Sequence, residues 1–245
     1  MTPDLDHVAV AVQDIDRTLD QLDAMGATLI MGERAPGVQY AVARLGDADT
    51  GMNLEVLTPW HPEENDFLER FLRAHGDGPH HLSFVMDDVR PMLGRLREEG
   101  LEPVQVKLGW APWEDGFVLA HGTVVQVAGT SLGYPPMKEM LAASERDEVL
   151  TLPCLEHGAD RGWWTGRKPA ASRVTLDRVL LGTTDLAGAR RLFGDLLGGI
   201  RDGDDYVWPR GARLRVVASE RDGIQGLQVR GEAPTTIGGA RITHG

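Results

Sequence analysis

The chain has 245 residues, of which 42% are hydrophobic, and its formal net charge is −12 at pH 7. This composition is typical of a globular protein with one large core or two modest ones. The negative charge argues against a nucleic-acid partner, because phosphate binding requires clustered Lys and Arg, and it favours a small-molecule or protein partner. A single cysteine, Cys154, cannot form an intrachain disulfide. Residues 1–25 lack the features of a signal peptide and no apolar run is long enough to cross a bilayer, so we expect a cytoplasmic protein without membrane contact.

One pattern occurs three times along the chain: a largely apolar run that ends in aspartate, followed by a helical pattern. The copies begin with residues 5–14, 78–88 and 176–185. Superposing them puts His7 on His81, whereas the third copy has Arg178 at this position. An internal repeat of this kind has to be identified before a fold is assigned.

The first copy begins with a run over residues 7–12 that is nearly all apolar, as in a strand buried on both faces. Asp14 is a suitable N-cap for the following helix, because its carboxylate can accept hydrogen bonds from the first turn. Ile15, Leu19 and Leu22 recur there at helical spacing. Three strands complete a βαβββ unit and are predicted at residues 28–32, 40–45 and 52–57.

A connector over residues 61–78 carries apolar residues at helical spacing and predicts a short helix. The second unit begins at His81, and its helix has Met92, Leu93 and Leu96 on the inward face. Its strands are predicted at residues 102–107, 116–120 and 123–128. It therefore has the same βαβββ order as the first unit.

Between residues 134 and 172 the periodicity fails, and prolines and glycines predict a linker. The third copy follows, with a helix that contains Leu192, Phe193 and Leu196. Its further strands are predicted at residues 206–208 and 214–218 and in two short segments after them. This third unit is thus complete, but a fourth unit would be truncated.

Two histidines at equivalent positions of a repeat are informative, because pseudo-symmetry brings their imidazoles to one centre. Glu55 lies in the apolar last strand of the first unit, where a charge is costly unless it is paired or bound to a cation. Gln126 lies in the matching strand of the second unit. The pattern predicts one divalent ion (Co, Ni, Zn, Mn or Fe) held by His7, Glu55, His81 and Gln126. Alternation along the strand predicts that the adjacent His80 faces the opposite side and is structural.

Four segments resemble the vicinal oxygen chelate superfamily, which includes glyoxalases and extradiol dioxygenases. They are DHVAVAV, NLEVLTP, GPHHLSFVMDD and HGTVVQVA, within residues 5–128, and their order is most similar to the methylmalonyl-CoA epimerase-like branch. The resemblance implies an α+β fold in which tandem βαβββ modules form a U-shaped mixed sheet around the metal. We therefore assign residues 1–133 to the metal-binding domain, 134–172 to a linker and 173–245 to a degenerate third βαβββ module.

In this superfamily the metal binds two substrate oxygens and stabilises an enolate or related anion, and its ligands come from the four positions named above. The bases of the epimerase branch are glutamates at positions that carry Tyr40 and Gln126 here, and neither side chain is a good carbon-acid base at neutral pH. The candidate catalytic residues are Glu55, as a ligand or a detachable base, Tyr40, as a hydrogen-bond donor, and Glu114, near the open side of the sheet. Tyr40 can equally be a packed strand aromatic, and Glu114 a solvated loop residue.

In the third unit Arg178 and Arg215 align with His7 and Glu55. Two arginines would repel a metal ion, so the alignment favours a structural role over anion binding. One βαβββ unit leaves its sheet half-covered, and it should pair either with the first domain or with its copy in a second chain. A homodimer is the expected assembly.

Three functions fit these observations. The leading hypothesis is a metal-dependent isomerase, epimerase or lyase that acts through an enolate-type intermediate on a small carbonyl or acyl thioester; the exchanged bases argue against strict methylmalonyl-CoA epimerase activity. The second is an iron-dependent dioxygenase, because two histidines and a carboxylate form a facial triad, although related oxygenases take the carboxylate from the last strand, here Gln126. The third is a ligand-binding or resistance protein that has kept the fold without turnover.

Overall fold

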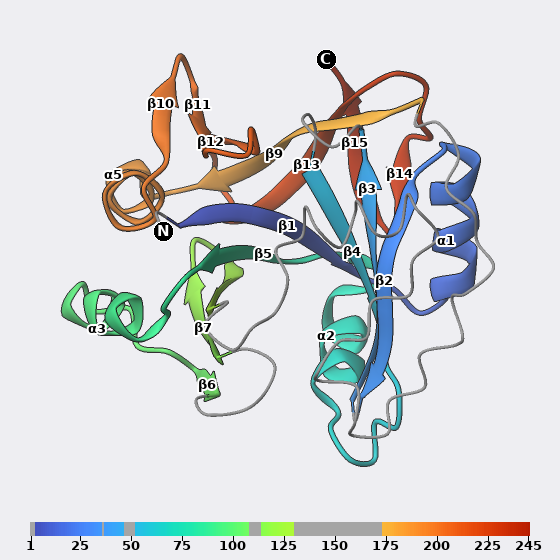
Figure 1. Ribbon diagram of the computed structural model, residues 1–245, viewed down its shortest axis with the longest axis horizontal. Helices are drawn as coiled ribbons and strands as arrows, with labels where there is room; N and C mark the ends of the chain where they lie inside the picture. The colour runs from blue at the N-terminus through green and yellow to red at the C-terminus, as the bar shows by residue number, and fades with distance from the viewer. Residues whose placement is uncertain (1–2, 36, 47–51, 108–113, 130–172) are drawn as a thin grey trace.

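The computed structural model describes residues 3–35, 37–46, 52–107, 114–129 and 173–245. These residues form two mixed β-sheets with few helices (Figure 1). The first sheet has the strand order β2-β3-β4-β1-β5-β8-β7-β6, and the second has the order β10-β11-β12-β9-β13-β15-β14. The linker expected over residues 134–172 lies outside the described residues.

The first sheet consists of the two predicted βαβββ units. The first unit comprises β1 (Asp4–Ala11), α1 (Ile15–Ala24), β2 (Thr28–Ala35), β3 (Val38–Leu45) and β4 (Met52–Thr58). The second comprises β5 (Gly78–Met86), α3 (Arg90–Glu98), β6 (Gln105–Lys107), β7 (Glu114–Ala120) and β8 (Thr123–Gly129). The predicted connector helix is α2 (Phe67–His75). The Asp14 carboxylate accepts a hydrogen bond from the backbone N of Arg17 at 2.9 Å, so this residue caps α1 as expected.

The two units are related by pseudo-two-fold symmetry at the centre of the sheet. β1 runs parallel to β4, β5 runs parallel to β8, and β1 and β5 pair antiparallel between them. In this central pair His7 lies opposite Ser83, and His81 lies opposite Ala9. The symmetry therefore carries one histidine onto the other, as the repeat predicted.

The second sheet repeats the pattern but is cut short. Its complete unit comprises β9 (Thr175–Thr183), α5 (Leu186–Arg190) continued by the π-helical turn η2 (Arg191–Leu196), β10 (Ile200–Asp202), β11 (Asp205–Val207) and β12 (Arg213–Ala218). The partial unit comprises β13 (Gly223–Arg230), β14 (Thr236–Ile237) and β15 (Ala240–His244). Residues 231–235 join β13 to β14 without a helix. The predicted truncation of a fourth unit is confirmed, although three strands follow β12 instead of two.

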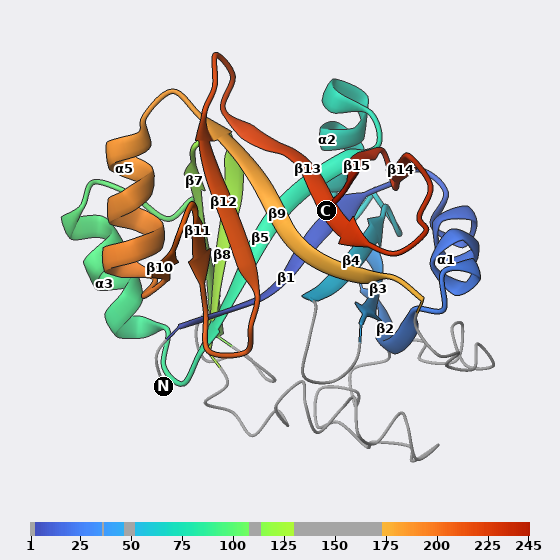
Figure 2. The same ribbon diagram turned by 90° about the horizontal axis from the view of Figure 1, so that it is seen from above.

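The two sheets pack against each other and share one apolar core. Its strand residues include Val8, Val10, Leu54, Val56, Leu82 and Phe84 from the first sheet and Val179, Leu181, Leu214, Leu227 and Val229 from the second. α3 and α5 lie side by side at one end of this sandwich, and α1 lies at the other end near β14 (Figures 1 and 2). The third unit thus covers the first domain of its own chain, one of the two pairings expected. A homodimer stays a prediction.

Two side-chain contacts fix how the sheets sit on each other. The ring of Trp208, which precedes β12, lies 5.2 Å from the ring of Phe84 in β5, and its Nε1 donates to the carbonyl of Leu197 at 2.8 Å. Arg210, in the same loop, forms an ion pair with the buried carboxylate of Asp4 at the start of β1. The loop before β12 therefore anchors the second sheet to the strand that carries His7.

On the opposite, inner face of the first sheet a smaller apolar cluster lies beneath α2. Its members are Ala9, Ala11, Ile30, Tyr40, Val42, Leu57, Leu68 and Leu72. Glu55 pairs with Ala9 in neighbouring strands, so its side chain emerges on this inner face. The core thus occupies one side of the first sheet, and the candidate ligands lie on the other.

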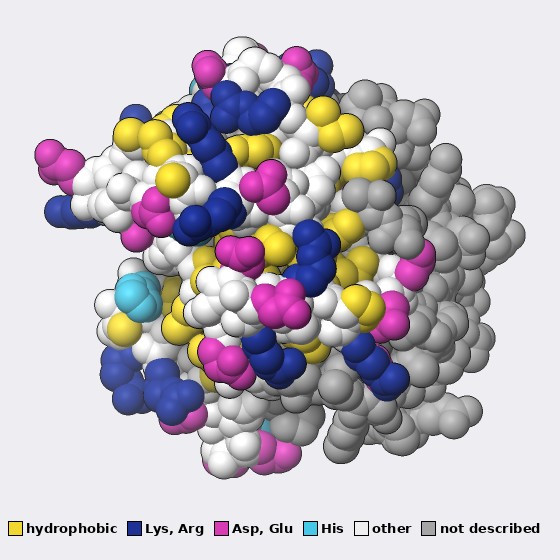
Figure 3. All heavy atoms as spheres, turned by 90° about the vertical axis from the view of Figure 1, so that its left-hand side faces the viewer, with side chains coloured by type: hydrophobic (Ala, Val, Ile, Leu, Met, Phe, Trp, Pro, Cys, Tyr) yellow, Lys and Arg dark blue, Asp and Glu magenta, His cyan; other side chains and the backbone are white. Residues whose placement is uncertain are grey.

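The surface that carries α3 and α5 has no broad area of a single charge. Acidic and basic side chains are interspersed there, with hydrophobic side chains visible between them (Figure 3). Among the described residues, no helix is long and apolar enough to cross a membrane.

Candidate metal centre

Three potential ligands converge on the inner face of the first sheet. The Nε2 atoms of His7 and His81 lie 3.3 Å and 3.4 Å from the same carboxylate oxygen, Oε2 of Glu55. One ligand atom from each residue lies within 4.8 Å of the others. A tetrahedral site with bonds of about 2.0–2.1 Å separates neighbouring ligands by roughly 3.4 Å. The spacing of these three atoms is therefore close to what a metal ion requires.

Each histidine is oriented by the residue that precedes it. The pairing of β1 with β5 skips Asp6 on one strand and His80 on the other, so both residues sit in β-bulges. Asp6 Oδ2 lies 2.9 Å from Nδ1 of His7, and Nδ1 of His80 lies 2.9 Å from Nδ1 of His81. A hydrogen bond at Nδ1 leaves Nε2 to face the centre, the arrangement that surrounding groups impose on metal-binding histidines.

The expectation that His80 faces the opposite side of β5 is therefore wrong. Its ring packs 4.7 Å from Phe71 and 6.1 Å from Phe67, both of which belong to α2 on the inner face. Strict alternation of side chains holds only in an uninterrupted ladder, and the bulge turns His80 towards the same side as His81.

The electrostatics of the two histidines differ. Burial lowers the pKa of His7, but the Glu55 and Asp6 carboxylates outweigh it and raise the pKa to about 10. Burial lowers the pKa of His81 well below its ordinary value, and the neighbouring His80 and His7 lower it further. Burial also lowers the pKa of His80 to about 4. In the absence of a cation the centre thus holds one imidazolium against Glu55, and the other imidazoles are neutral.

These residues fit a divalent cation. The Nε2 atoms of both His7 and His81 are buried, and among the described residues they have no aligned hydrogen-bond partner, only the Glu55 oxygen at ion-pair distance. A buried polar atom without a partner is costly, and imidazole nitrogens with a carboxylate are ligands that Zn, Fe, Co, Ni and Mn accept. A cation among the three ligands would satisfy both nitrogens and offset the charge of Glu55.

Gln126 lies beside this cluster, as its place in the repeat predicted. It pairs with Ser83, the residue opposite His7, and is near enough to His81 to counteract slightly the lowering of that residue's pKa. Its Nε2 donates to Oδ2 of Asp115 at 3.1 Å. Because the amide nitrogen is engaged there, the amide oxygen is the atom that remains for a cation.

The structure does not bring Glu114 to the ligands. A Cβ at Gly116, two residues further along β7, would collide with Leu93 of α3, so this side of the strand faces the helix. Glu114 is on the same side and forms an ion pair with Arg90 of α3. The carboxylate that reaches the inner face is Asp115, only 2% exposed. Phe117 pairs with Gln126, which fixes the side of β7 on which each residue lies. The strand predicted at residues 116–120 begins two residues earlier, at Glu114, so Glu114 lies in the strand and not in a solvated loop.

Tyr40 lies on the inner face near the ligands. It pairs with Leu57, and two residues further along β3 Val42 pairs with Glu55. The side chain of Tyr40 is buried in the apolar cluster beneath α2. Tyr40 is thus part of the packed wall next to Glu55.

Residues 6–117 match the family model described as "Glyoxalase/Bleomycin resistance protein/Dioxygenase superfamily". No curated protein matches the sequence significantly. Two similar solved structures are methylmalonyl-CoA epimerases. One, in complex with methylmalonyl-CoA, is 22% identical with a TM-score of 0.47, and the match covers 56% of this chain and 100% of that chain. The other, from Mycobacterium tuberculosis, is 25% identical with a TM-score of 0.44, and the match covers 51% of this chain and 87% of that chain.

A third similar structure extends over both sheets. A 4-hydroxymandelate synthase mutant from Streptomyces coelicolor is 18% identical, with a TM-score of 0.59 over 94% of this chain and 71% of its own. At this identity the likeness concerns the fold, and it supports tandem modules that continue into a second sheet. The family match and the paired βαβββ units lead to one conclusion: residues 6–117 form a domain of the glyoxalase/bleomycin resistance protein/dioxygenase (vicinal oxygen chelate) superfamily.

Proposed function

We propose that the protein is a metal-dependent isomerase, epimerase or lyase that moves a proton next to the carbonyl of a small substrate, such as a 2-oxo acid or an acyl thioester. The convergence of His7, Glu55 and His81 on one point is the observation that carries this proposal. A divalent cation held there supplies a fixed positive charge beside a substrate oxygen that becomes negative in the reaction.

The chain's own residues divide the remaining work. His7 and His81, held at Nδ1 by Asp6 and His80, present Nε2 to the centre. Gln126 offers its amide oxygen as a fourth ligand, because Asp115 holds its amide nitrogen. These contacts fix the geometry of the ligands before a substrate arrives, which lowers the cost of reorganisation during the reaction.

We assign the proton transfer to a carboxylate on the inner face. Asp115 is the stronger candidate, because it lies beside Gln126 and has no role as one of the three converging ligands. Glu55 is the second candidate, as a ligand that detaches. A carboxylate within hydrogen-bonding reach of the substrate carbon can act as a general base.

The test begins with elemental analysis of protein purified without added metal. We expect near-stoichiometric Co, Ni, Zn or Mn in the wild type and its loss in both His7→Ala and His81→Ala. His75→Ala is a matched control, because His75 is exposed on α2 and contacts Phe71 instead of the ligands. A wild type that binds no divalent metal even after reconstitution would contradict the proposal.

The reaction itself is tested by hydrogen exchange. Metal-loaded protein in deuterated water should incorporate deuterium next to the carbonyl of at least one member of a panel of acyl thioesters and 2-oxo acids. Exchange should disappear in His7→Ala and persist in His75→Ala. Metal binding without exchange on any panel member, but with stoichiometric binding of a ligand, would favour a non-catalytic binding protein.

An iron-dependent oxygenase is a second candidate, favoured by the composition of the converging set. Two histidines and one carboxylate are the ligands of the facial triad of non-haem iron oxygenases. Iron in the purified protein, together with oxygen uptake in the presence of a catechol or 2-oxo acid, would favour this candidate over the isomerase.

A further inference from the structure

The second sheet has the same strand register as the metal centre of the first sheet, but it carries basic side chains at two of the positions of the metal ligands. In the first sheet Val8 pairs with Leu54 and Ala9 with Glu55; in the second, Val179 pairs with Leu214 and Leu180 with Arg215. This register places Arg215 at the position of Glu55.

The bulge that orients the first histidine is also repeated. The pairing of β9 with β13 skips Asp177, as the pairing of β1 with β5 skips Asp6. Asp177 Oδ2 accepts hydrogen bonds from Nε and Nη2 of the next residue, Arg178, at 3.0 Å and 2.8 Å. Arg178 is therefore held by its preceding aspartate just as His7 is held by Asp6.

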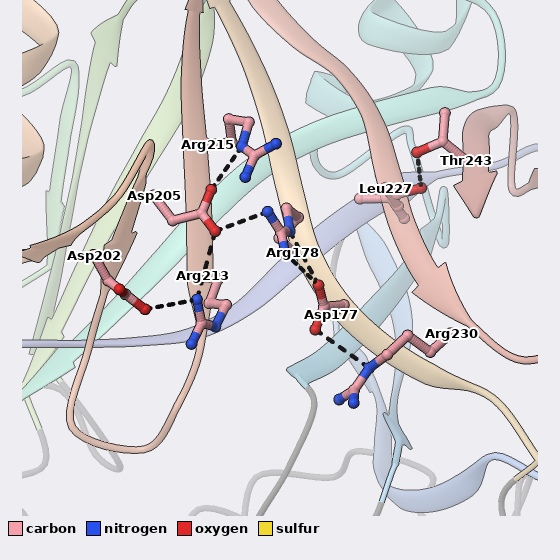
Figure 4. Close-up of polar contacts among 9 residues, drawn as sticks. All are labelled: Asp177, Arg178, Asp202, Asp205, Arg213, Arg215, Leu227, Arg230 and Thr243. Atoms are coloured by element: carbon pink, nitrogen blue, oxygen red, sulfur yellow. Dashed lines mark hydrogen bonds and ion pairs between the residues drawn. The ribbon is translucent and has the colours of Figure 1, made fainter. Parts of the chain in front are cut away.

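The other two ligand positions offer no metal donor of comparable strength. Gly226 pairs with Leu180 as His81 pairs with Ala9, and Thr243 pairs with Gln228 as Gln126 pairs with Ser83. The hydroxyl of Thr243 donates to the carbonyl of Leu227 (Figure 4). The second sheet thus has guanidinium groups where the first has its histidine and glutamate, and it does not suit a cation.

Three arginines gather around one buried carboxylate, that of Asp205 (Figure 4). Asp205 Oδ2 lies 2.8 Å from Nη1 of Arg178 and 3.5 Å from Nη1 of Arg213, and Oδ1 lies 2.7 Å from Nε of Arg215. The Asp205 side chain is 3% exposed, whereas those of Arg213 and Arg215 are about a third exposed at 33% and 34%. The carboxylate forms the base of the cluster, and two guanidinium groups reach solvent.

The charges of the cluster balance. Arg178, Arg213 and Arg215 face the carboxylates of Asp177 and Asp205. At its edge Arg230 pairs with Asp177, Asp202 pairs with Arg213, and Asp204 lies near Arg215. Four arginines against four aspartates give 4 − 4 = 0, a locally neutral region in a chain whose net charge is −12.

Arg215 has donors to spare within the described part of the chain. It donates to Asp205 through Nε, and its Nη atoms make no hydrogen bond with the described residues (Figure 4). Arg213 reaches both Asp202 and Asp205 through Nη1. One guanidinium would suffice to pair with Asp205, so a purely structural role does not account for three guanidinium groups at this carboxylate. Planar guanidinium groups with free N–H atoms match the oxygens of phosphate and carboxylate.

We propose that this arginine cluster, Arg178, Arg213 and Arg215, binds an oxyanion group of a small molecule, either a phosphate or a carboxylate. Arg213 and Arg215 contact the anion from the exposed side, while Asp177 and Asp205 hold Arg178 beneath it and keep the guanidinium groups from dispersing. The second sheet is then an anion site built on the framework of a cation site. This inference does not depend on the proposed reaction.

The test is a calorimetric titration at low ionic strength of protein dialysed free of metal, with inorganic phosphate, citrate and acetate in separate arms. Low salt matters because exposed charges are screened over about 10 Å at 0.1 M. We expect saturable binding in at least one arm, phosphate marking a phosphate site and citrate or acetate a carboxylate site. Arg215→Met should weaken binding at least tenfold, and Arg191→Met, an exposed arginine on η2, should leave it unchanged.

Asp205→Asn separates binding from folding. It removes the competing carboxylate and raises the cluster's charge from 0 to +1, so it should bind the anion more tightly even if it lowers the unfolding midpoint. A purely structural network predicts the loss of stability without any binding. Failure of both the wild type and folded Asp205→Asn to bind any of the three anions, or equal affinities in Arg215→Met and wild type, would overturn the proposal.

Discussion

The Nδ1 atoms of His80 and His81 lie 2.9 Å apart although the two residues are neighbours in a strand. The bulge at His80 makes this contact possible, and the symmetric bulge at Asp6 does the same for His7. Each ligand histidine therefore carries its orienting group in the preceding position. The two orienting groups differ in charge: His7 is held by the carboxylate of Asp6, and His81 by the imidazole of His80.

Replacing His80 by phenylalanine should weaken metal binding. The variant keeps an aromatic ring against Phe71 but removes the partner of His81 Nδ1, and loss of such orienting groups lowers metal affinity by about 10- to 100-fold. Competition with a calibrated chelator measures the affinity. His75→Phe is the control, since it also faces Phe71 but does not contact His81. Equal affinities in His80→Phe and wild type would show that the contact does not orient the ligand.

Asp115→Asn should remove activity without removing the metal. If this carboxylate accepts the proton, its loss lowers the rate of deuterium exchange by about 10²- to 10⁴-fold, while elemental analysis still finds the cation. The adjacent Glu114→Gln is the matched control, because Glu114 pairs with Arg90 on the other side of β7. The opposite pattern, with exchange lost only in Glu114→Gln, would contradict the assignment.

The repeat made the fold and the ligand set accessible from the sequence. Equivalent positions of two βαβββ units identified His7 and His81, and the apolar surroundings of Glu55 marked it as a charge that needs a partner. The repeat positions and the apolar surroundings of Glu55 are local features, because they depend only on the order of residues along each strand. The same reasoning placed Arg178 and Arg215 at the corresponding positions of the third unit.

Other features depend on pairing between strands, which the sequence does not state. The bulge at His80 is a register shift against β1. Pro79 beside it is a residue typical of strand starts and bulges, but it does not state which residue the pairing skips. The choice between Glu114 and Asp115 depends on which of them shares a side with Gln126, and a one-residue difference in register reverses it. The sequence also left open whether the third unit covers its own chain, because half-covered sheets can pair either way.

His121 should make stability depend on pH. It lies in the turn between β7 and β8, and its Nδ1 is 2.9 Å from the Thr183 hydroxyl of the second sheet. Burial lowers its pKa below the ordinary 6.5, and nearby Asp185 and Asp222 offset this only in part. The folded protein therefore binds this proton less readily than the unfolded chain. The contribution of neutral His121 to the free energy of unfolding is fully present above pH 6.5 and is lost as the pH falls through the lowered pKa.

His121→Asn tests the predicted loss of stability on acidification. Asparagine tolerates the positive φ of 49° at this position and has no titratable proton. Urea unfolding at pH 8, 6.5 and 5 should show the wild type losing more stability on acidification than the variant. Asp222, whose pKa is lowered below 3.8 in part by His121, stays ionised over this range, so the difference between the two proteins reports on His121. A difference between the two proteins that stays constant over this range would exclude the effect.

We expect the ion pairs of Arg210 to stabilise the packing of the second sheet on the first. Its Nε lies 2.8 Å from Oδ2 of Asp4, and its Nη1 lies 3.4 Å from Oδ1 of Asp6, the residue that holds His7. Burial raises the pKa of Asp4 despite this partner, so the carboxylate depends on Arg210 to remain ionised at low cost.

Arg210→Met leaves two aspartates without this cation and should lower the free energy of unfolding by about 3 kcal/mol. Adding Asp4→Asn removes one of the stranded charges and should recover part of the loss, whereas Arg201→Met, an exposed arginine on β10, should change little. Urea unfolding of the four proteins measures this, and a double variant no more stable than Arg210→Met would show that the pairing with Asp4 is not what stabilises the junction.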